Sequence, residues 1–177
     1  GSFRFAINGD GSQVEVGNVA VWSGSSWRAL GGGVSANPQS LAIAVDDEGN
    51  VYVRGSFQSP ARNIARWLAS EQRWSCLGYD CTLDAGVRYF GNDASGGDYV
   101  NEIVTAGDDV YVAGQFSVAS EDLNNINVPR TTNLAVWNRG TERWSAVGGG
   151  LVNNVNYSNE VHALAYYDGV LYVGGRF

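Results

Sequence analysis

VYVAGQF, residues 110–116, occurs in more than one version along this chain. VYVRGSF (51–57) and LYVGGRF (171–177) are further copies, and Gly1–Phe3 matches the end of a fourth, although a vector scar would also supply the first two residues. The phenylalanines that end the copies are 54, 59 and 61 residues apart: Phe3, Phe57, Phe116 and Phe177. Such regular spacing indicates a chain built from one recurring structural unit.

A second motif contains every tryptophan of the chain. NVAVW (18–22), NIARW (63–67) and NLAVW (133–137) share one pattern, and each is followed by a WxxLG-type segment: SWRALG, RWSCLG and RWSAVG. We expect these tryptophans to fill the space between adjacent units, because a single sheet cannot cover its own apolar face. They are structural motif residues with no expected catalytic role: Trp22, Trp27, Trp67, Trp74, Trp137 and Trp144.

Each unit resolves into four short strands. The first is expected at 39–46, 101–108 and 161–168, and the YVxGxF, NxAxW and WxxLG segments supply the other three. Apolar residues alternate within them, and short connections rich in Asp, Gly or Asn are typical of hairpins. Four-stranded antiparallel units at this spacing predict an all-β fold made of β-propeller blades. They form one domain over 1–177, with repeat periods at roughly 4–57, 58–116 and 117–177.

These motifs resemble those of secreted kelch-like β-propeller repeats, in particular those of the fungal cortical polarity marker and its bacterial surface-protein relatives. The family unit runs LYVGGxF, NxAxW, WxxLGxG and VxALA, and residues 133–177 match it best. Arg54 replaces the first glycine of YVGG, and CLGYDC (76–81) stands where LGGG is expected. The resemblance implies an extracellular or cell-surface propeller. It implies no chemistry, because members of the family share no single reaction.

The chain begins with the last two strands of a unit and ends with the first two, so one unit is divided between its ends. Three arrangements could complete that unit. The chain is an excerpt of a longer array, or a second chain completes the unit in a six-bladed ring or a filament. The third arrangement pairs both halves within one chain, in a ring smaller than the usual four to eight blades. The absence of methionine also indicates a processed, recombinant or excerpted chain. The expected partners are the chain itself or adjacent repeats, through unpaired strand edges.

Cys76 and Cys81 lie five residues apart, a spacing that favours a local disulfide over free thiols or a metal site. A disulfide would place the protein in an oxidising compartment and fits a secreted location. A metal site would need more ligands, and the single histidine, His162, lies far along the chain. Asn156 begins an NYS triplet, a glycosylation acceptor that also arises by chance.

Composition excludes two classes of partner. A net charge of −7 disfavours nucleic acid, which requires concentrated basic side chains. The longest apolar runs, such as Leu41–Val45, are too short to insert into a membrane as a helix.

The connections after the second and fourth strands are long and lie on one face of the expected scaffold, which is where binding residues gather. Aromatic residues outside the motifs occur there beside Asn and Asp, a combination that suits sugar stacking and hydroxyl recognition. Packing of the loops themselves is the alternative role for these rings: Tyr79, Tyr89, Phe90, Tyr99 and Tyr157.

Acidic residues in two of these loops suggest calcium as the one conceivable cofactor, although neither loop has a DxDxDG pattern. They are Asp80, Asp84, Asp93 and Asp98 in one loop, and Glu121 and Asp122 in the other. Paired carboxylates also serve glycosidases, but sequence spacing does not give the separation that a mechanism needs.

The favoured function is therefore a non-catalytic extracellular propeller with a structural, adhesive or self-assembling role. A carbohydrate-binding module on the long-loop face is the first alternative, and a propeller fragment of a larger secreted enzyme is the second.

Overall fold

The computed structural model describes residues 2–34, 42–55, 57, 59–61, 63–78, 81, 85–88, 99–120, 131–151 and 159–177. Within these residues the chain forms short antiparallel strands and no helix, which confirms the all-β prediction. Since the described part contains no helix, it also contains none that could cross a membrane.

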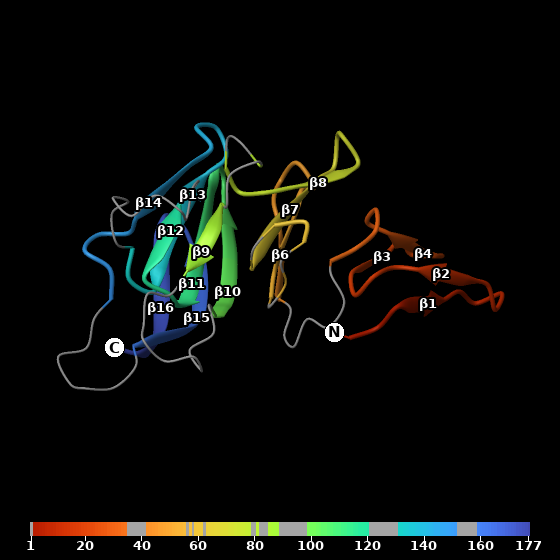
Figure 1. Ribbon diagram of the computed structural model, residues 1–177, viewed down its shortest axis with the longest axis horizontal. Helices are drawn as coiled ribbons and strands as arrows, with labels where there is room; N and C mark the ends of the chain where they lie inside the picture. The colour runs from red at the N-terminus through yellow and green to blue at the C-terminus, as the bar shows by residue number, and fades with distance from the viewer. Residues whose placement is uncertain are drawn as a thin grey trace.

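Two four-stranded antiparallel sheets form the centre of the molecule (Figure 1). In both sheets the strands lie side by side in the order of the sequence, and the motifs predicted both sheets. Sheet I consists of β5 (Ala42–Val45), β6 (Val51–Arg54), β7 (Ile64–Leu68) and β8 (Arg73–Ser75). Sheet II consists of β10 (Tyr99–Ala106), β11 (Asp109–Gln115), β13 (Leu134–Asn138) and β14 (Arg143–Ala146).

Two hairpins contain the halves of a further unit. The N-terminal hairpin is β3 (Ala20–Trp22) with β4 (Trp27–Ala29), and the C-terminal hairpin is β15 (Glu160–Tyr167) with β16 (Val170–Arg176). Two smaller pairs were not predicted, and both lie in the long connections. They are β1 (Phe5–Ile7) with β2 (Gln13–Glu15), and β9 (Gly86–Arg88) with β12 (Val118–Ser120).

The sheets pack face to face because side chains alternate along each strand. In β6, Val53 points to the N-terminal hairpin, and the neighbouring Tyr52 points to sheet II. Three apolar cores result: one between the N-terminal hairpin and sheet I, one between the two sheets, and one between sheet II and the C-terminal hairpin.

The packed sheets form an open row (Figure 1). The N-terminal hairpin lies at one end, and the C-terminal hairpin packs on β10 and β11 at the other. Within the described residues the two hairpins do not pair with each other. A ring of three blades closed within one chain, one of the three arrangements that the sequence leaves open, is therefore not seen among the described residues.

The tryptophans form cross-strand pairs, as their place in the two motifs required. Trp67 lies opposite Trp74, Trp137 opposite Trp144, and Trp22 opposite Trp27. The rings of the first pair meet edge to face, with centroids 5.5 Å apart. Such pairs stabilise adjacent strands beyond the area that they bury.

The motif asparagines fix the chain before each Trp-containing strand. All three have a positive φ, which asparagine tolerates better than most residues. Each donates its backbone N–H to the carbonyl of the phenylalanine that ends the preceding motif; the pairs are Asn18–Phe3, Asn63–Phe57 and Asn133–Phe116. Phe3 therefore occupies the same position as the other motif phenylalanines.

Candidate assembly interface

The C-terminal hairpin presents an aromatic outer face. Leu171 and Val173 of β16 point inward and pack on sheet II. Tyr172, between them, points outward and is 56% exposed, and Tyr167 of β15 is 75% exposed. In β6 the tyrosine equivalent to Tyr172 is Tyr52, which is fully buried against Trp137. The outer face of β16 therefore carries a residue that is part of the core elsewhere in the chain.

The N-terminal hairpin has a complementary feature at the opposite end of the row. Val19 and Val21 face sheet I, whereas Trp22 faces away from it and is 50% exposed. Its ring packs only on Trp27, at a centroid distance of 5.2 Å. The equivalent tryptophans Trp67 and Trp137 are buried. The exposed ring of Trp22 is therefore a candidate contact surface.

Both hairpins also leave a backbone edge open. Among the described strands, β16 pairs only with β15, and β3 pairs only with β4. The corresponding strands inside the molecule, β6 and β7, or β11 and β13, pair with each other. An open edge presents unpaired N–H and C=O groups and is a template for another strand.

Indole hydrogen bonds tie each sheet to the one before it. Trp74 of sheet I donates from Nε1 to the Leu30 carbonyl after β4, and Trp144 of sheet II donates in the same way to the Leu77 carbonyl after β8. Both distances are 2.8 Å. Trp27 is the equivalent residue of the N-terminal hairpin, and its indole makes no hydrogen bond to a described residue.

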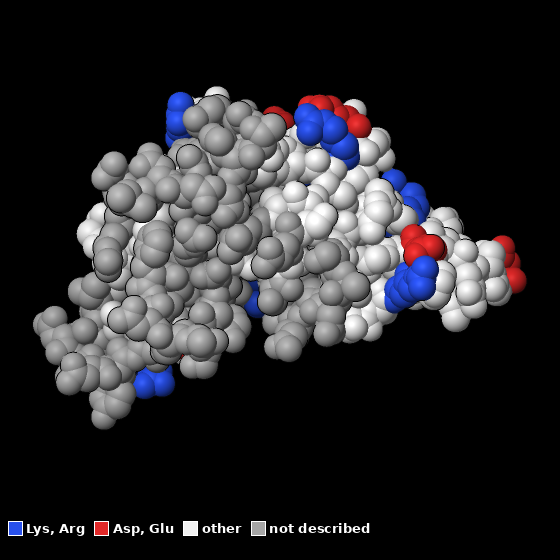
Figure 2. Space-filling view, viewed as in Figure 1, with Lys and Arg blue, Asp and Glu red and all other residues white. Residues whose placement is uncertain are grey.

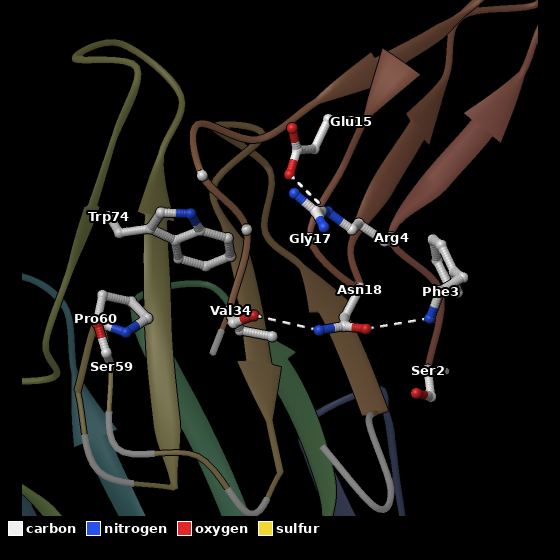
Figure 3. Close-up of a pocket in the computed structure, with 12 residues that line it drawn as sticks. Ser2, Phe3, Arg4, Glu15, Gly17, Asn18, Val34, Ser59, Pro60 and Trp74 are labelled. Atoms are coloured by element: carbon white, nitrogen blue, oxygen red, sulfur yellow. Dashed lines mark hydrogen bonds and ion pairs between the residues drawn. The ribbon is translucent and has the colours of Figure 1, made fainter. Parts of the chain in front are cut away.

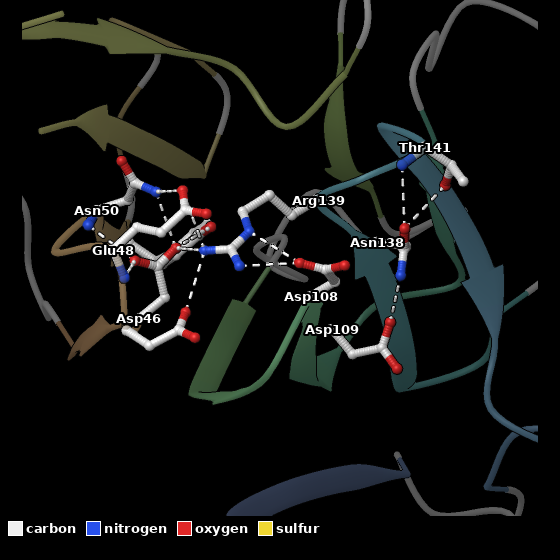
Figure 4. Close-up of polar contacts among 10 residues, drawn as sticks. Asp46, Glu48, Asn50, Asp108, Asp109, Asn138, Arg139 and Thr141 are labelled. Carbon is white, nitrogen blue, oxygen red and sulfur yellow. Dashed lines mark hydrogen bonds and ion pairs between the residues drawn. The ribbon is translucent and has the colours of Figure 1, made fainter. Parts of the chain in front are cut away.

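A charged cluster strengthens the junction between the two sheets (Figure 4). Arg139, in the turn before β14, donates to Asp46 of sheet I at 2.9 Å and to Asp108 of its own sheet at 2.8 Å. The Asp46 side chain is only 1% exposed and also accepts hydrogen bonds from Asn50 and Tyr52. The cluster joins turns that are 93 residues apart in sequence.

The ionisation of these groups follows from their contacts. Burial acts to raise the pKa of the Asp46 carboxyl, but hydrogen bonds from Asn50 and Tyr52 and the charge of Arg139 outweigh it and hold that pKa below its usual value. Burial and the neighbouring Asp46 carboxylate raise the pKa of Tyr52. Hydrogen bonding to Asp108 and Asp46 raises the pKa of Arg139. These shifts keep Asp46 and Arg139 charged at neutral pH, so they form an ion pair between the two sheets.

Further polar links cross the same junction. Arg66 of β7 lies over the ring of Trp137, 4.6 Å from its centre, and pairs with Glu142 of sheet II at 3.0 Å. Arg54 donates to the Asn101 carbonyl of β10 at 2.7 Å. Arg54 stands where the C-terminal copy of the motif has Gly174, and it thus connects two sheets.

A cleft of about 810 Å³ lies where the N-terminal hairpin meets sheet I (Figure 3). Its charged and amide side chains are already paired: Arg4 binds Glu15, and the Asn18 amide bridges Phe3 N and the Val34 carbonyl. The described lining holds one carboxylate and no His, Cys or Asp. We therefore assign no chemistry to this cleft.

Among the described residues on the face in Figure 2, some acidic and basic side chains lie side by side and others lie singly. No group of three or more potential metal ligands occurs among the residues that the structure describes.

The predicted disulfide is present and joins Cys76 to Cys81, across a Cα–Cα distance of 5.5 Å. It is consistent with an oxidising compartment. All six motif tryptophans lie in or at the start of the expected strands, as described above.

The predicted binding residues mostly lie outside the described residues. Tyr99 begins β10, but its side chain is not described. The other aromatic candidates, the glycosylation candidate and the calcium candidates are all outside: Tyr79, Tyr89, Phe90, Tyr157, Asn156, Asp80, Asp84, Asp93, Asp98, Glu121 and Asp122. The sugar-binding and calcium hypotheses stay predictions.

Sequence reasoning missed the contacts between sheets. Asp46 ends one copy of the first-strand segment, as Asp108 and Asp168 end the others, but nothing in the repeat links it to Arg139, because that contact forms only when the sheets pack. The exposed aromatic faces could have been predicted from the repeat. Trp22 and Tyr172 occupy motif positions that pack on a neighbouring unit, and at the two ends of the row there is no such unit on that side.

Comparison with protein-family models, curated proteins and solved structures finds no match to this chain.

Proposed function

We propose that this chain is a non-catalytic β-propeller segment of a secreted or cell-surface protein, and that its role is structural or adhesive and depends on self-assembly. The main support is that the end hairpins expose residues whose motif equivalents are buried between sheets. Tyr172 and Trp22 are each at least half exposed, whereas Tyr52 and Trp137 are fully buried. Full burial of an exposed ring of this kind is worth about 1.5–3 kcal/mol, so covering the exposed half of these rings favours association.

The blade interpretation has separate support. The units share one strand order, pack face to face, and repeat the same indole-to-carbonyl link from one sheet to the next. Identical units joined by a constant step form a ring or an open superhelix. The Cys76–Cys81 disulfide supports the extracellular assignment, because such bonds persist in oxidising compartments.

The test is the solution mass of the 18.9 kDa chain by light scattering over a wide range of concentrations. We expect the wild type to reach twice that mass or more. Trp22→Lys and Tyr172→Lys place a charge on the two faces and should hold the chain at the mass of a single copy. Ile7→Lys, at an exposed apolar position of β1, is the matched control and should associate like the wild type.

A wild type that stays a single copy at every concentration would contradict the proposal. So would Trp22→Lys and Tyr172→Lys variants that associate as strongly as the Ile7→Lys control, because assembly would then use another surface.

A further inference from the structure

The two end hairpins lack opposite parts of the same unit. The C-terminal hairpin has the first two strands of the four-stranded pattern, and the N-terminal hairpin has the last two. What β16 lacks on its open edge is an NxAxW strand, and β3 is such a strand with its own edge open. A second copy of this chain therefore offers the element that completes each hairpin.

The two intact sheets fix how these strands would pair. In sheet I, Val51 lies opposite Trp67 and Tyr52 opposite Arg66. In sheet II, Val110 lies opposite Trp137 and Tyr111 opposite Val136. The register is the same in both sheets: the residue before the motif tyrosine lies opposite the tryptophan of NxAxW, and the tyrosine lies opposite the residue before that tryptophan.

We infer that β3 of a second copy pairs antiparallel with β16, with Leu171 opposite Trp22, Tyr172 opposite Val21 and Val173 opposite Ala20. This inference rests on the proposed function and adds the partner and the register. Its evidence is the open edges of β3 and β16 and the register of the two intact sheets. A shift of this register by one residue would turn every side chain of the added strand to the wrong face.

The same register buries the exposed aromatics of the N-terminal hairpin. Trp22 and Trp27 of the second copy would face sheet II, as Trp67 and Trp74 face the N-terminal hairpin. Trp27 would then donate to the Val147 carbonyl after β14.

The Val147 carbonyl has the same local geometry as the Leu30 carbonyl. Val147 O accepts from Gly150 N, as Leu30 O accepts from Gly33 N, and Gly148 and Gly31 share a φ near +55° (58° and 54°). The Leu30 carbonyl also accepts the Trp74 indole at 2.8 Å, which is the bond that Trp27 would reproduce.

The outward face of β16 would be covered at the same time. Tyr172 would meet Trp67 of the second copy, as Tyr52 meets Trp137 at a centroid distance of 6.3 Å within the chain. One docking movement thus covers the open edges and the exposed rings of both hairpins.

One segment competes with this docking. Phe3 donates to the Asn18 side chain at 3.0 Å and accepts from the Asn18 backbone at 2.8 Å. Phe116 holds the same place beside Asn133 and is 1% exposed, but Phe3 is 41% exposed. In the assembled pair, Phe177 of one copy takes the place beside Asn18 of the other, and Phe3 is displaced.

Cysteine cross-linking tests the register. Chains carrying Tyr172→Cys are mixed with chains carrying Val21→Cys, and chains carrying Val173→Cys with chains carrying Ala20→Cys, followed by mild oxidation. No other thiol interferes, because the described cysteines form a disulfide. Two adjacent pairs are used because ladder positions alternate between wide and close spacing. The crossed mixtures, Tyr172→Cys with Ala20→Cys and Val173→Cys with Val21→Cys, are the controls, since those side chains lie on opposite faces.

We expect at least one in-register mixture to give a cross-linked dimer with a yield about tenfold above both crossed mixtures. Equal yields in all four mixtures, with association intact, would overturn the register and leave the proposed function standing. A chain that never associates would overturn both.

Removal of residues 1–3 tests the displacement of Phe3. The shortened chain should associate more tightly, by about tenfold in dissociation constant, because the place beside Asn18 is then open. Unchanged or weaker association would overturn that part of the inference.

Discussion

The junction between sheets I and II and the outer faces of the two end hairpins are built from the same motif residues, yet they differ in burial. At the junction, Tyr52 and Trp137 are fully buried and the ion pair of Asp46 with Arg139 crosses between the sheets. At the ends, Tyr172 and Trp22 are at least half exposed. The motif therefore encodes a surface that needs a neighbour, and the ends of this row lack one.

This comparison separates two roles of one residue type. A motif aromatic at the junction contributes to the stability of a single chain. The same aromatic at an end contributes little to that stability and is available for association. Substitutions at matched positions should separate the two roles.

The largest effect is expected for Trp137→Ala. It empties a buried site in contact with Tyr52 and Arg66, and should lower the free energy of unfolding by about 3–5 kcal/mol. Trp22→Ala, at the equivalent exposed position, should cost about 1 kcal/mol or less in dilute solution. Urea unfolding of both variants measures this difference, and equal losses would show that the ends are as well packed as the junction.

A smaller loss is expected for Arg139→Met. It removes a charge partner from the buried Asp46 carboxylate, which keeps its hydrogen bonds to Asn50 and Tyr52, so we expect a loss of about 2–3 kcal/mol. Arg4→Met removes an ion pair between exposed side chains and should change the free energy of unfolding by less than about 1 kcal/mol. If the two losses were alike in urea unfolding, the cluster would not hold the sheets together.

The acid dependence of stability should report the same cluster. Because the pKa of Asp46 is lower in the folded chain than in the unfolded chain, its carboxylate stabilises the fold above the unfolded pKa. That contribution is lost as the pH falls through the folded pKa. Asp46→Asn should therefore flatten the fall in stability below about pH 4. Thermal melts from pH 6 to pH 2 measure it, and an unchanged slope would contradict this role.

The smallest effect is expected for the indole hydrogen bonds. Trp74→Phe keeps a six-membered ring but removes the indole N–H that binds the Leu30 carbonyl and the atoms of the second ring, and should cost about 1–2 kcal/mol in the single chain. Trp27→Phe should leave the stability of the single chain nearly unchanged and weaken association instead. If Trp27→Phe lowered the stability of the single chain and left association unchanged, the indole of Trp27 would form its hydrogen bond within the chain, and the prediction would be wrong.

The local structure followed from the sequence because it depends on short spacings. Trp67 and Trp74 are close in sequence and flank a turn, so their pairing across a hairpin was predictable. Cys76 and Cys81 form their disulfide for the same reason. The β1–β2 pair was missed, although Asn8–Gly11 between those strands is a turn signal.

The contacts between sheets were not predictable in the same way. Arg139 meets Asp46 only after two sheets have packed, and no motif links residues so far apart. The strand content of the end hairpins was predicted, but whether they close within the chain depends on the angle between neighbouring sheets. That angle is set by packing rather than by any short sequence pattern.

Amide hydrogen exchange, followed by mass spectrometry as the protein concentration is raised, tests the central claim most directly. The account predicts that peptides covering β16 and β3 become protected together, while protection of β11 and β13 does not change. Protection that is independent of concentration, or that changes in only one of the two strands, would contradict the claim that the end hairpins complete each other between copies.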